Sequence, residues 1–178
     1  AKHINLTAME VAAWEKKNKP CLPRISAVEY PERTLPIDPY VLGAWLGNGT
    51  SSSGRMSMHP DDVCFMRGQF EKAGHATTTH VALDSFGITG LGAKLRNAGL
   101  LNNKHIPEEY LLASIPQRMA LLQGLMDTDG HVDKIGRCSF QNTNMGLVVG
   151  AREILQSLGL KARLRVYFDT RQRHKTRK

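Results

Sequence analysis

The chain is poor in cysteine and in aromatic side chains, which limits what can hold it together. It has 3 cysteines and 7 histidines in 178 residues, and 6% of its residues are aromatic. Three widely spaced cysteines are too few for a thiolate metal cage, and their odd number argues against a disulfide framework. The histidines lack the paired spacing of a zinc site. We therefore expect no structural zinc, and we expect Cys21, Cys64 and Cys138 to be buried as small apolar side chains.

A long hydrophobic run and a phosphate-binding loop are also missing. No apolar stretch is long enough to span a bilayer, and no N-terminal signal peptide is present. No predicted strand leads into a glycine-rich loop of the kind that binds nucleotide phosphates. These absences predict a cytoplasmic protein without a membrane partner, and they argue against nucleotide hydrolysis.

Acidic residues are outnumbered by basic ones. Lys and Arg total 24 against 16 Asp and Glu, which gives a formal net charge of +8. Such an excess favours an anionic partner, nucleic acid first, although an ordinary basic surface would also account for it. The position of the charges favours nucleic acid, because basic residues crowd the C-terminal end: Arg163, Arg165, Arg171, Arg173, Lys175, Arg177 and Lys178.

Capping and turn signals divide the chain into an N-terminal arm and two halves. In the arm, residues 1–34, the capping box Thr7-Ala8-Met9-Glu10 predicts a short helix that ends near Trp14. A proline-containing extended stretch follows it. We interpret the arm as a DNA-contacting segment or as a remnant of a flanking domain. The first half is placed at residues 35–100 and the second at residues 101–178.

The first half is predicted to alternate helices and strands. Asp38-Pro39 opens a long helix in the preferred way, with a capping acid followed by proline in the first turn. A polar loop at 50–54 separates this helix from the next element. Alternation and helix stop signals then predict a strand at 55–59, a helix at 60–73, a strand at 77–83, and short helices at 90–98 and 107–113.

The second half repeats this order. Ser114 caps another long helix, which is followed by a predicted strand at 137–141, a helix at 143–158 and a strand at 161–168. The repeat is visible residue by residue, since Arg-x-Ser-x-Gln at 137–141 aligns with Arg-x-Ser-x-His at 55–59. The repeat predicts an α/β (α+β) fold of two pseudo-symmetric halves within one monomer.

The two long helices share an apolar pattern that ends in polar residues. The patterns are Val41-Leu42-Gly43-Ala44-Trp45-Leu46-Gly47-Asn48-Gly49 and Leu121-Leu122-Gln123-Gly124-Leu125-Met126-Asp127-Thr128-Asp129-Gly130. Gly43 and Gly124 would let two helix backbones approach closely. These motifs resemble the LAGLIDADG signature of homing endonucleases. The resemblance implies a central pair of motif helices and a DNA-binding β-sheet saddle.

In that family, the end of each motif helix holds a divalent metal ion. The resemblance implies Asp129 and Thr128 as metal ligands, and it places Gly47 and Asn48 at the equivalent end of the first helix. Mg²⁺ or Mn²⁺ would supply the charge neutralisation and the activated water that phosphodiester hydrolysis requires. Asn48 departs from the pattern, because a neutral amide binds a hard cation more weakly than a carboxylate. We therefore expect cleavage to be impaired or absent, through natural decay or through deliberate inactivation.

The resemblance implies two further catalytic residues. Lys104 opens the block Lys104-His105-Ile106-Pro107, which is similar to the linking segment of intein-type endonucleases and implies a catalytic lysine. Gln141 corresponds to a polar residue that holds the water network in the family, and His59 is its partner in the repeat. Each has an ordinary alternative, because Lys104 could be a solvated loop residue and the other two could be polar residues of a sheet face.

The resemblance spans about residues 35–168 and implies double-stranded DNA with a long recognition site as the partner. Polar side chains that alternate along the predicted strands are candidates for contacts with bases or phosphates. These candidates are Arg55, Ser57, His59, Arg137, Ser139, Arg163 and Arg165. Any one of them could be a solvated strand residue, but the alternation of the whole set favours contact with DNA.

Two alternative functions remain open. The same fold could serve a non-cleaving LAGLIDADG DNA-binding protein or an RNA maturase. The resemblance is strongest to endonuclease domains of inteins in replicative helicases, and an intein needs a nucleophile at its first position and Asn at its end. This chain begins with Ala1 and ends with Lys178. We therefore expect no self-splicing, and we interpret the chain as a free endonuclease or as the endonuclease domain of a larger intein.

Overall fold

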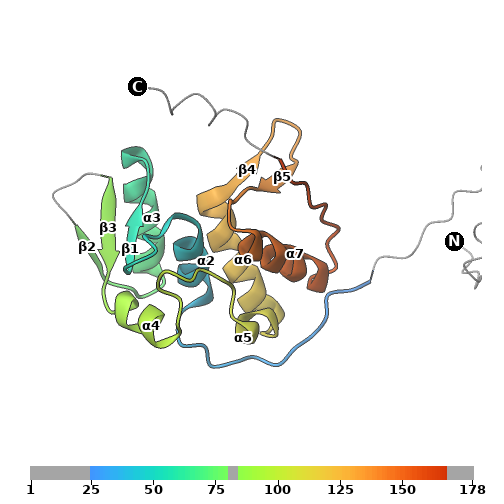
Figure 1. The fold of residues 1–178 in the computed structure, drawn as a ribbon, viewed down its shortest axis with the longest axis horizontal. Helices are drawn as coiled ribbons and strands as arrows, with labels where there is room; N and C mark the ends of the chain where they lie inside the picture. Colours follow the sequence, from blue (N-terminus) through green and yellow to red (C-terminus); the bar gives the residue numbers. More distant parts are fainter. Residues whose placement is uncertain (1–24, 80–83, 168–178) are drawn as a thin grey trace, which may run out of the picture.

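Two long helices lie side by side at the centre of a mixed α/β fold. The computed structural model describes residues 25–79 and 84–167. The central helices are α2 (Pro39–Asn48) and α6 (Ile115–Asp129), which pack against each other more extensively than any other pair of elements (Figure 1). Each motif helix therefore belongs to the core, and the predicted α/β fold with a central helix pair is confirmed.

Both central helices begin at the capping residues that the sequence predicts. The Asp38 carboxylate accepts a hydrogen bond of 3.1 Å from the Val41 amide, and proline follows at the first helical position. At the start of α6, Ser114 and Gln117 form a capping box. Each helix ends at a glycine with extended backbone, Gly49 or Gly130, and the chain turns there into a β-hairpin or bridge.

Two glycines make the close approach of the central helices possible. A Cβ atom at Gly43 would lie 2.1 Å from the carbonyl oxygen of Leu121, and a Cβ at Gly124 would lie 2.2 Å from that of Tyr40. Only hydrogen fits at either position, so the expected crossing is confirmed. The Tyr40 hydroxyl also donates a hydrogen bond of 3.0 Å to Asp127, and burial together with this carboxylate raises the pKa of Tyr40.

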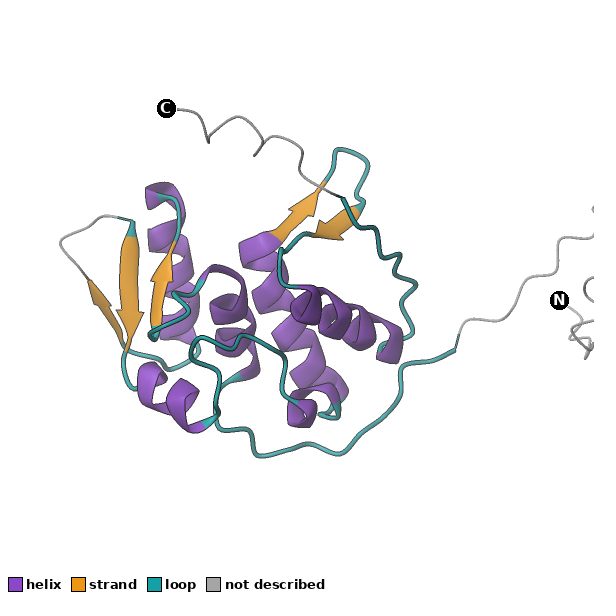
Figure 2. Ribbon diagram, in the orientation of Figure 1, coloured by secondary structure: helices purple, strands orange, loops and turns teal. Residues whose placement is uncertain are grey.

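The first half contains a three-stranded antiparallel sheet. Its strands β1 (Arg55–Ser57), β2 (Thr77–Thr79) and β3 (Ser85–Ile88) are arranged in the order β1-β3-β2. Helix α3 (Pro60–Lys72) lies beside the sheet and α4 (Leu91–Asn97) follows it (Figure 2). The sheet buries Met56, Phe86 and Ile88 in the core. The central strand, β3, is absent from the sequence prediction.

The second half contains a smaller, two-stranded sheet. Helix α5 (Glu108–Leu111) precedes α6, and β4 (Gly130–Val132) and β5 (Cys138–Phe140) form an antiparallel hairpin. Helix α7 (Met145–Ser157) then packs against α6 (Figure 1). In the part of the chain that the structure describes, no helix combines the length and apolar character that crossing a membrane requires.

The halves repeat each other, but in a register that differs from the sequence alignment by two residues. Gly49 bridges Met56 in the first half, and Gly130 pairs with Phe140 in the second. Met56 is therefore the structural counterpart of Phe140, whereas the alignment of Arg-x-Ser patterns matched it to Cys138. The aligned arginines consequently occupy different places in the two hairpins.

The predicted strand at 161–168 is wrong over the residues that the structure describes, because 161–167 adopt no regular structure. In the first half, β2 follows α3 closely and pairs only with β3. A strand after α7 would be the counterpart of β2, so it would need a partner strand equivalent to β3. The described part of the second half has no such strand. Within the described residues, the second sheet consists of β4 and β5 alone, and Leu164 and Val166 stay exposed.

Two smaller predictions also need comment. Cys64 and Cys138 are exposed, so the expected burial is wrong for both, whereas Cys21 lies outside the described residues. The capping-box helix of the arm lies outside them too. Residues 25–38 have no helix or strand, as expected, yet they run along the second half before they reach α2 (Figure 1). The amide of Val28 donates a hydrogen bond of 2.8 Å to Ser157 at the end of α7.

Candidate active site at the ends of the motif helices

The C-terminal ends of α2 and α6 lie against each other. A Cβ atom at Gly47 would lie 2.9 Å from Cβ of Thr128 and 3.5 Å from Cγ of Asp129. The structure therefore brings Gly47 close to Thr128 and Asp129. Asn48 directly follows Gly47 in the chain. The Thr128 hydroxyl donates to backbone carbonyls of its own helix at 3.0 and 3.1 Å. Its role is to hold the last turn of α6 as well as to face α2.

Asp129 is half-buried and is held by a residue that the sequence analysis missed. Nδ2 of Asn142 donates a hydrogen bond of 2.7 Å to Oδ2 of Asp129. Gln141, which was predicted to lie on a strand and to hold a water network, follows β5 and is exposed, and its backbone amide donates to the Asp129 carbonyl at 3.4 Å. The side chain that touches the acid is that of its neighbour, Asn142.

Lys104 reaches the end of the first motif helix. Its ammonium donates hydrogen bonds to the carbonyl oxygens of Leu46, at 3.0 Å, and of Gly47, at 3.2 Å. It also lies 5.0 Å from the centroid of the Trp45 ring, a cation–π arrangement. Burial lowers the pKa of Lys104 to about 8, and the nearby Asp129 carboxylate opposes this shift. Lys104 is therefore a partly buried cation beside both motif ends rather than a solvated loop lysine.

The two helix ends differ in charge and in support. Asp129 supplies a carboxylate, whereas Asn48 at the equivalent position supplies a neutral amide. Among the described residues, no three His, Cys, Asp or Glu side chains cluster as a metal site. The oxygen donors at this place are one carboxylate, an amide and backbone carbonyls. Such a set fits a hard cation such as Mg²⁺, which keeps several waters and takes phosphate oxygens as further ligands.

Comparison with known proteins identifies the second motif. Residues 116–178 match the family model of the LAGLIDADG-like domain. The chain carries a LAGLIDADG-like domain. Over 135 residues, or 76% of its length, the chain is 39% identical to the replicative DNA helicase DnaB of Mycobacterium intracellulare. The chain spans about a fifth of the length of that relative. Both similarities are consistent with an intein-type LAGLIDADG endonuclease.

In the first half, the exposed face of the sheet is polar. The buried side chains of β1 and β3 point to the core, so Arg55 and Ser57 lie on the opposite face. The Arg55 guanidinium donates a hydrogen bond of 2.9 Å to Ser85 on β3. His59 is different, because it lies at the start of α3 and its ring nitrogen accepts from the Asp61 amide at 3.4 Å. It caps a helix rather than lying in the strand.

In the second half, the candidate DNA contacts are exposed, but they do not share one face of a sheet. Arg137 precedes β5 and donates a hydrogen bond of 2.8 Å to Asp133 in the hairpin turn. The backbone amide and guanidinium of Arg137 lower the pKa of Asp133. Ser139 lies in β5, and Arg163 and Arg165 are exposed in the irregular segment after α7. All four side chains are therefore accessible to a ligand, but the strand that was expected to carry Arg163 and Arg165 is absent from the described residues.

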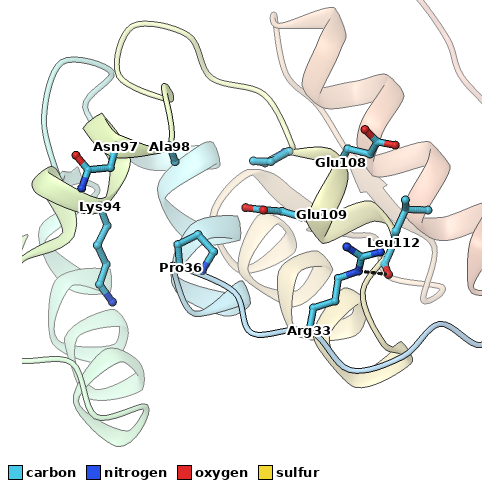
Figure 3. A pocket seen from close by; sticks show the side chains of 9 residues that line it. Arg33, Pro36, Lys94, Asn97, Ala98, Glu108, Glu109 and Leu112 are labelled. Atoms are coloured by element: carbon cyan, nitrogen blue, oxygen red, sulfur yellow. Dashed lines mark hydrogen bonds between the residues drawn. The ribbon is translucent and has the colours of Figure 1, made fainter.

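A surface cavity lies away from the motif ends. A cavity with a volume of about 860 Å³ is lined by residues of the entering segment, α4 and α5: Arg33, Pro36, Lys94, Asn97, Ala98, Pro107, Glu108, Glu109 and Leu112 (Figure 3). Arg33 is engaged at its edge, because its Nε donates to the Leu112 carbonyl at 2.9 Å. None of the lining residues belongs to the motif ends. This cavity is therefore separate from the candidate site.

Proposed function

We propose that this chain is the DNA-binding endonuclease part of an intein-type LAGLIDADG protein, with one competent and one impaired motif end. The observation that carries the proposal is the juxtaposition of Asp129, Gly47 and Lys104 where two motif helices end together. A carboxylate that can hold a metal ion, with a cation close to it, supplies the groups that hydrolysis of a phosphodiester requires.

Each residue has a distinct part in this proposal. Asp129 would hold a divalent ion, which when bound supplies charge neutralisation and an activated water. Lys104 keeps a positive charge beside that place and can stabilise negative charge that develops on a phosphate. Gln141 is exposed next to Asn142, and its side-chain amide can contact water or DNA. Asn48 carries no negative charge to bind a metal ion, so the DNA strand at that motif end would be cleaved slowly or not at all.

A non-cleaving DNA-binding protein is the second candidate, and a specific contact favours it. The Gly47 carbonyl is one of the oxygens that α2 could offer to a metal ion, and it already accepts a hydrogen bond from Lys104. With Asn48 beside it, that helix end has little to attract a second cation. Both candidates require duplex binding, so they differ only in whether the backbone is cut.

Binding can be tested with duplex DNA in which the two segments of the host gene that flank the coding sequence of the intein are joined. We expect affinity to fall steeply with salt, because each neutralised phosphate releases counterions. Replacing Arg163 and Arg165 with alanine should lower affinity and reduce the salt slope by roughly two phosphate contacts. The matched control removes Lys94 and Arg96 of α4, the former in the hollow away from the motif ends. Equal loss in both double variants would show that Arg163 and Arg165 make no specific contribution to DNA binding.

A further inference from the structure

Asn142 and Asn144 connect the candidate acid to the candidate lysine. Oδ1 of Asn142 accepts a hydrogen bond of 2.8 Å from the Asn144 amide, and its Nδ2 donates to Asp129. The first contact fixes the orientation of the amide, because only the carbonyl oxygen can accept. The amino group of Asn142 must therefore face the Asp129 carboxylate.

Asn144 in turn is anchored by a helix. Its Oδ1 caps α7 by accepting from the Gly146 amide at 2.9 Å, and its Nδ2 donates to the Lys104 carbonyl at 2.7 Å. The start of α7 thus holds both the backbone of Lys104 and, through Asn142, the carboxylate of Asp129. Two groups that lie 25 residues apart in the chain share one rigid support.

The other half of the protein lacks this arrangement. With Met56 as the counterpart of Phe140, the position that corresponds to Asn142 is Met58. Met58 is apolar and partly buried against the core, so it has no amide to offer. The half with the acid therefore has the amide, and the half with Asn48 in place of the acid has neither. This pairing links the role of Asn142 to the carboxylate rather than to folding of the hairpin.

We propose that Asn142 is a positioning residue for Asp129, which holds Oδ2 of the carboxylate and so fixes the orientation in which Oδ1 would be offered to a divalent ion. The proposal rests on the proposed function, since it assigns a role to Asn142 in metal binding by Asp129. Groups that orient a metal ligand typically change metal affinity by roughly 10–100-fold when they are removed. Loss of Asn142 leaves the carboxylate present but free to rotate away from the ion.

The test measures Mn²⁺ binding to the full chain by the loss of the free-ion electron paramagnetic resonance signal. Asn142→Ser retains an oxygen for the Asn144 amide but is too short to reach Asp129. We expect its Kd for Mn²⁺ to rise roughly tenfold or more, with unchanged duplex affinity in chelator and an unchanged melting temperature. Asn103→Ser is the matched control, because the Asn103 side chain donates an exposed hydrogen bond to the Gly99 carbonyl, away from Asp129. It should leave all three quantities unchanged.

A double-variant cycle separates positioning from general damage. In the Asp129→Asn background, Asn142→Ser should have no further effect on Mn²⁺ binding, because the group that it orients is gone. Should Asn142→Ser bind Mn²⁺ as tightly as the parent protein, the positioning role is overturned while the proposed function stands. Absence of Mn²⁺ binding by the parent protein would instead overturn both.

Discussion

The ammonium of Lys104 donates a hydrogen bond of 3.0 Å to the carbonyl oxygen of Leu46 in the last turn of α2. It makes a second bond, of 3.2 Å, to Gly47. A cation at a helix C-terminus is stabilised by the partial negative charge of the unpaired carbonyls. Lys104 therefore supplies positive charge at the motif end that has Asn48 instead of an acid.

This placement predicts a specific dependence of stability on pH. The pKa of Lys104 is lowered from 10.5 to about 8 by burial. Between these values the unfolded state holds more protons than the folded state, so the free energy of unfolding rises with pH. Below about pH 8 the cost of burying the charge is fully present. Urea midpoints at pH 7 to 10 should therefore rise more in the parent protein than in Lys104→Met. A constant difference between the two proteins would contradict the assignment.

The helix crossing predicts opposite effects of the same substitution at two glycines. Gly124→Ala should destabilise by roughly 1–3 kcal/mol or more, because its Cβ would lie 2.2 Å from the Tyr40 carbonyl oxygen and 2.6 Å from the Ala44 amide. Gly68→Ala in α3 meets no atom within 4 Å and should stabilise by about 0.5–1 kcal/mol. Chemical denaturation of both variants measures these changes. Similar effects of the two substitutions would show that the helices do not meet at Gly124.

Arg118 predicts how the entering segment is held. Its side chain is fully buried in α6, where burial lowers the pKa of the guanidinium. It donates to the carbonyls of Ala113, at 2.8 Å, and of Val28, and to the Ser157 hydroxyl. Arg118→Leu should destabilise by about 1–3 kcal/mol for each acceptor left unpaired and should expose residues 25–33 to protease.

The control for this prediction is Arg152→Leu, which removes an exposed arginine from α7. It should change neither stability nor cleavage after Glu29 by a glutamate-specific protease. If Arg118→Leu unfolds at the same denaturant concentration as Arg152→Leu, the buried arginine does not tie the segment to the second half.

The helices could be predicted from sequence because their boundaries depend on local chemistry. Asp38-Pro39 and Ser114 mark the starts of α2 and α6, and both begin where expected. The short strands β3 and β4 were missed, because three or four residues carry little periodicity and their conformation depends on partners distant in the chain. The strand expected at 161–168 had the pattern but no partner among the described residues, so alternation alone was insufficient.

The candidate site shows the same division. Gly43, Gly124, Lys104 and Asp129 belong to motifs with a recognisable spacing, and the structure brings them to one crossing and its end. Asn142 could not be found in this way, because an Asn after a strand is typical of turns and helix caps. Its contact with Asp129 exists only once the β4–β5 hairpin has folded.

Metal-dependent cleavage by one competent motif end is tested most directly by digestion of a supercoiled plasmid in the presence of Mg²⁺ or Mn²⁺. The plasmid carries the joined host-gene segments used in the binding experiment. The parent protein, Asn48→Asp and Asp129→Asn are compared at concentrations that saturate the site, and nicked and linear products are separated. We expect at most slow nicking by the parent, linear product from Asn48→Asp, and no cleavage by Asp129→Asn, because metal-bound oxygens stabilise the transition state. Binding by Asn48→Asp without cleavage of either DNA strand would overturn the proposed cleavage and favour a protein that only binds DNA.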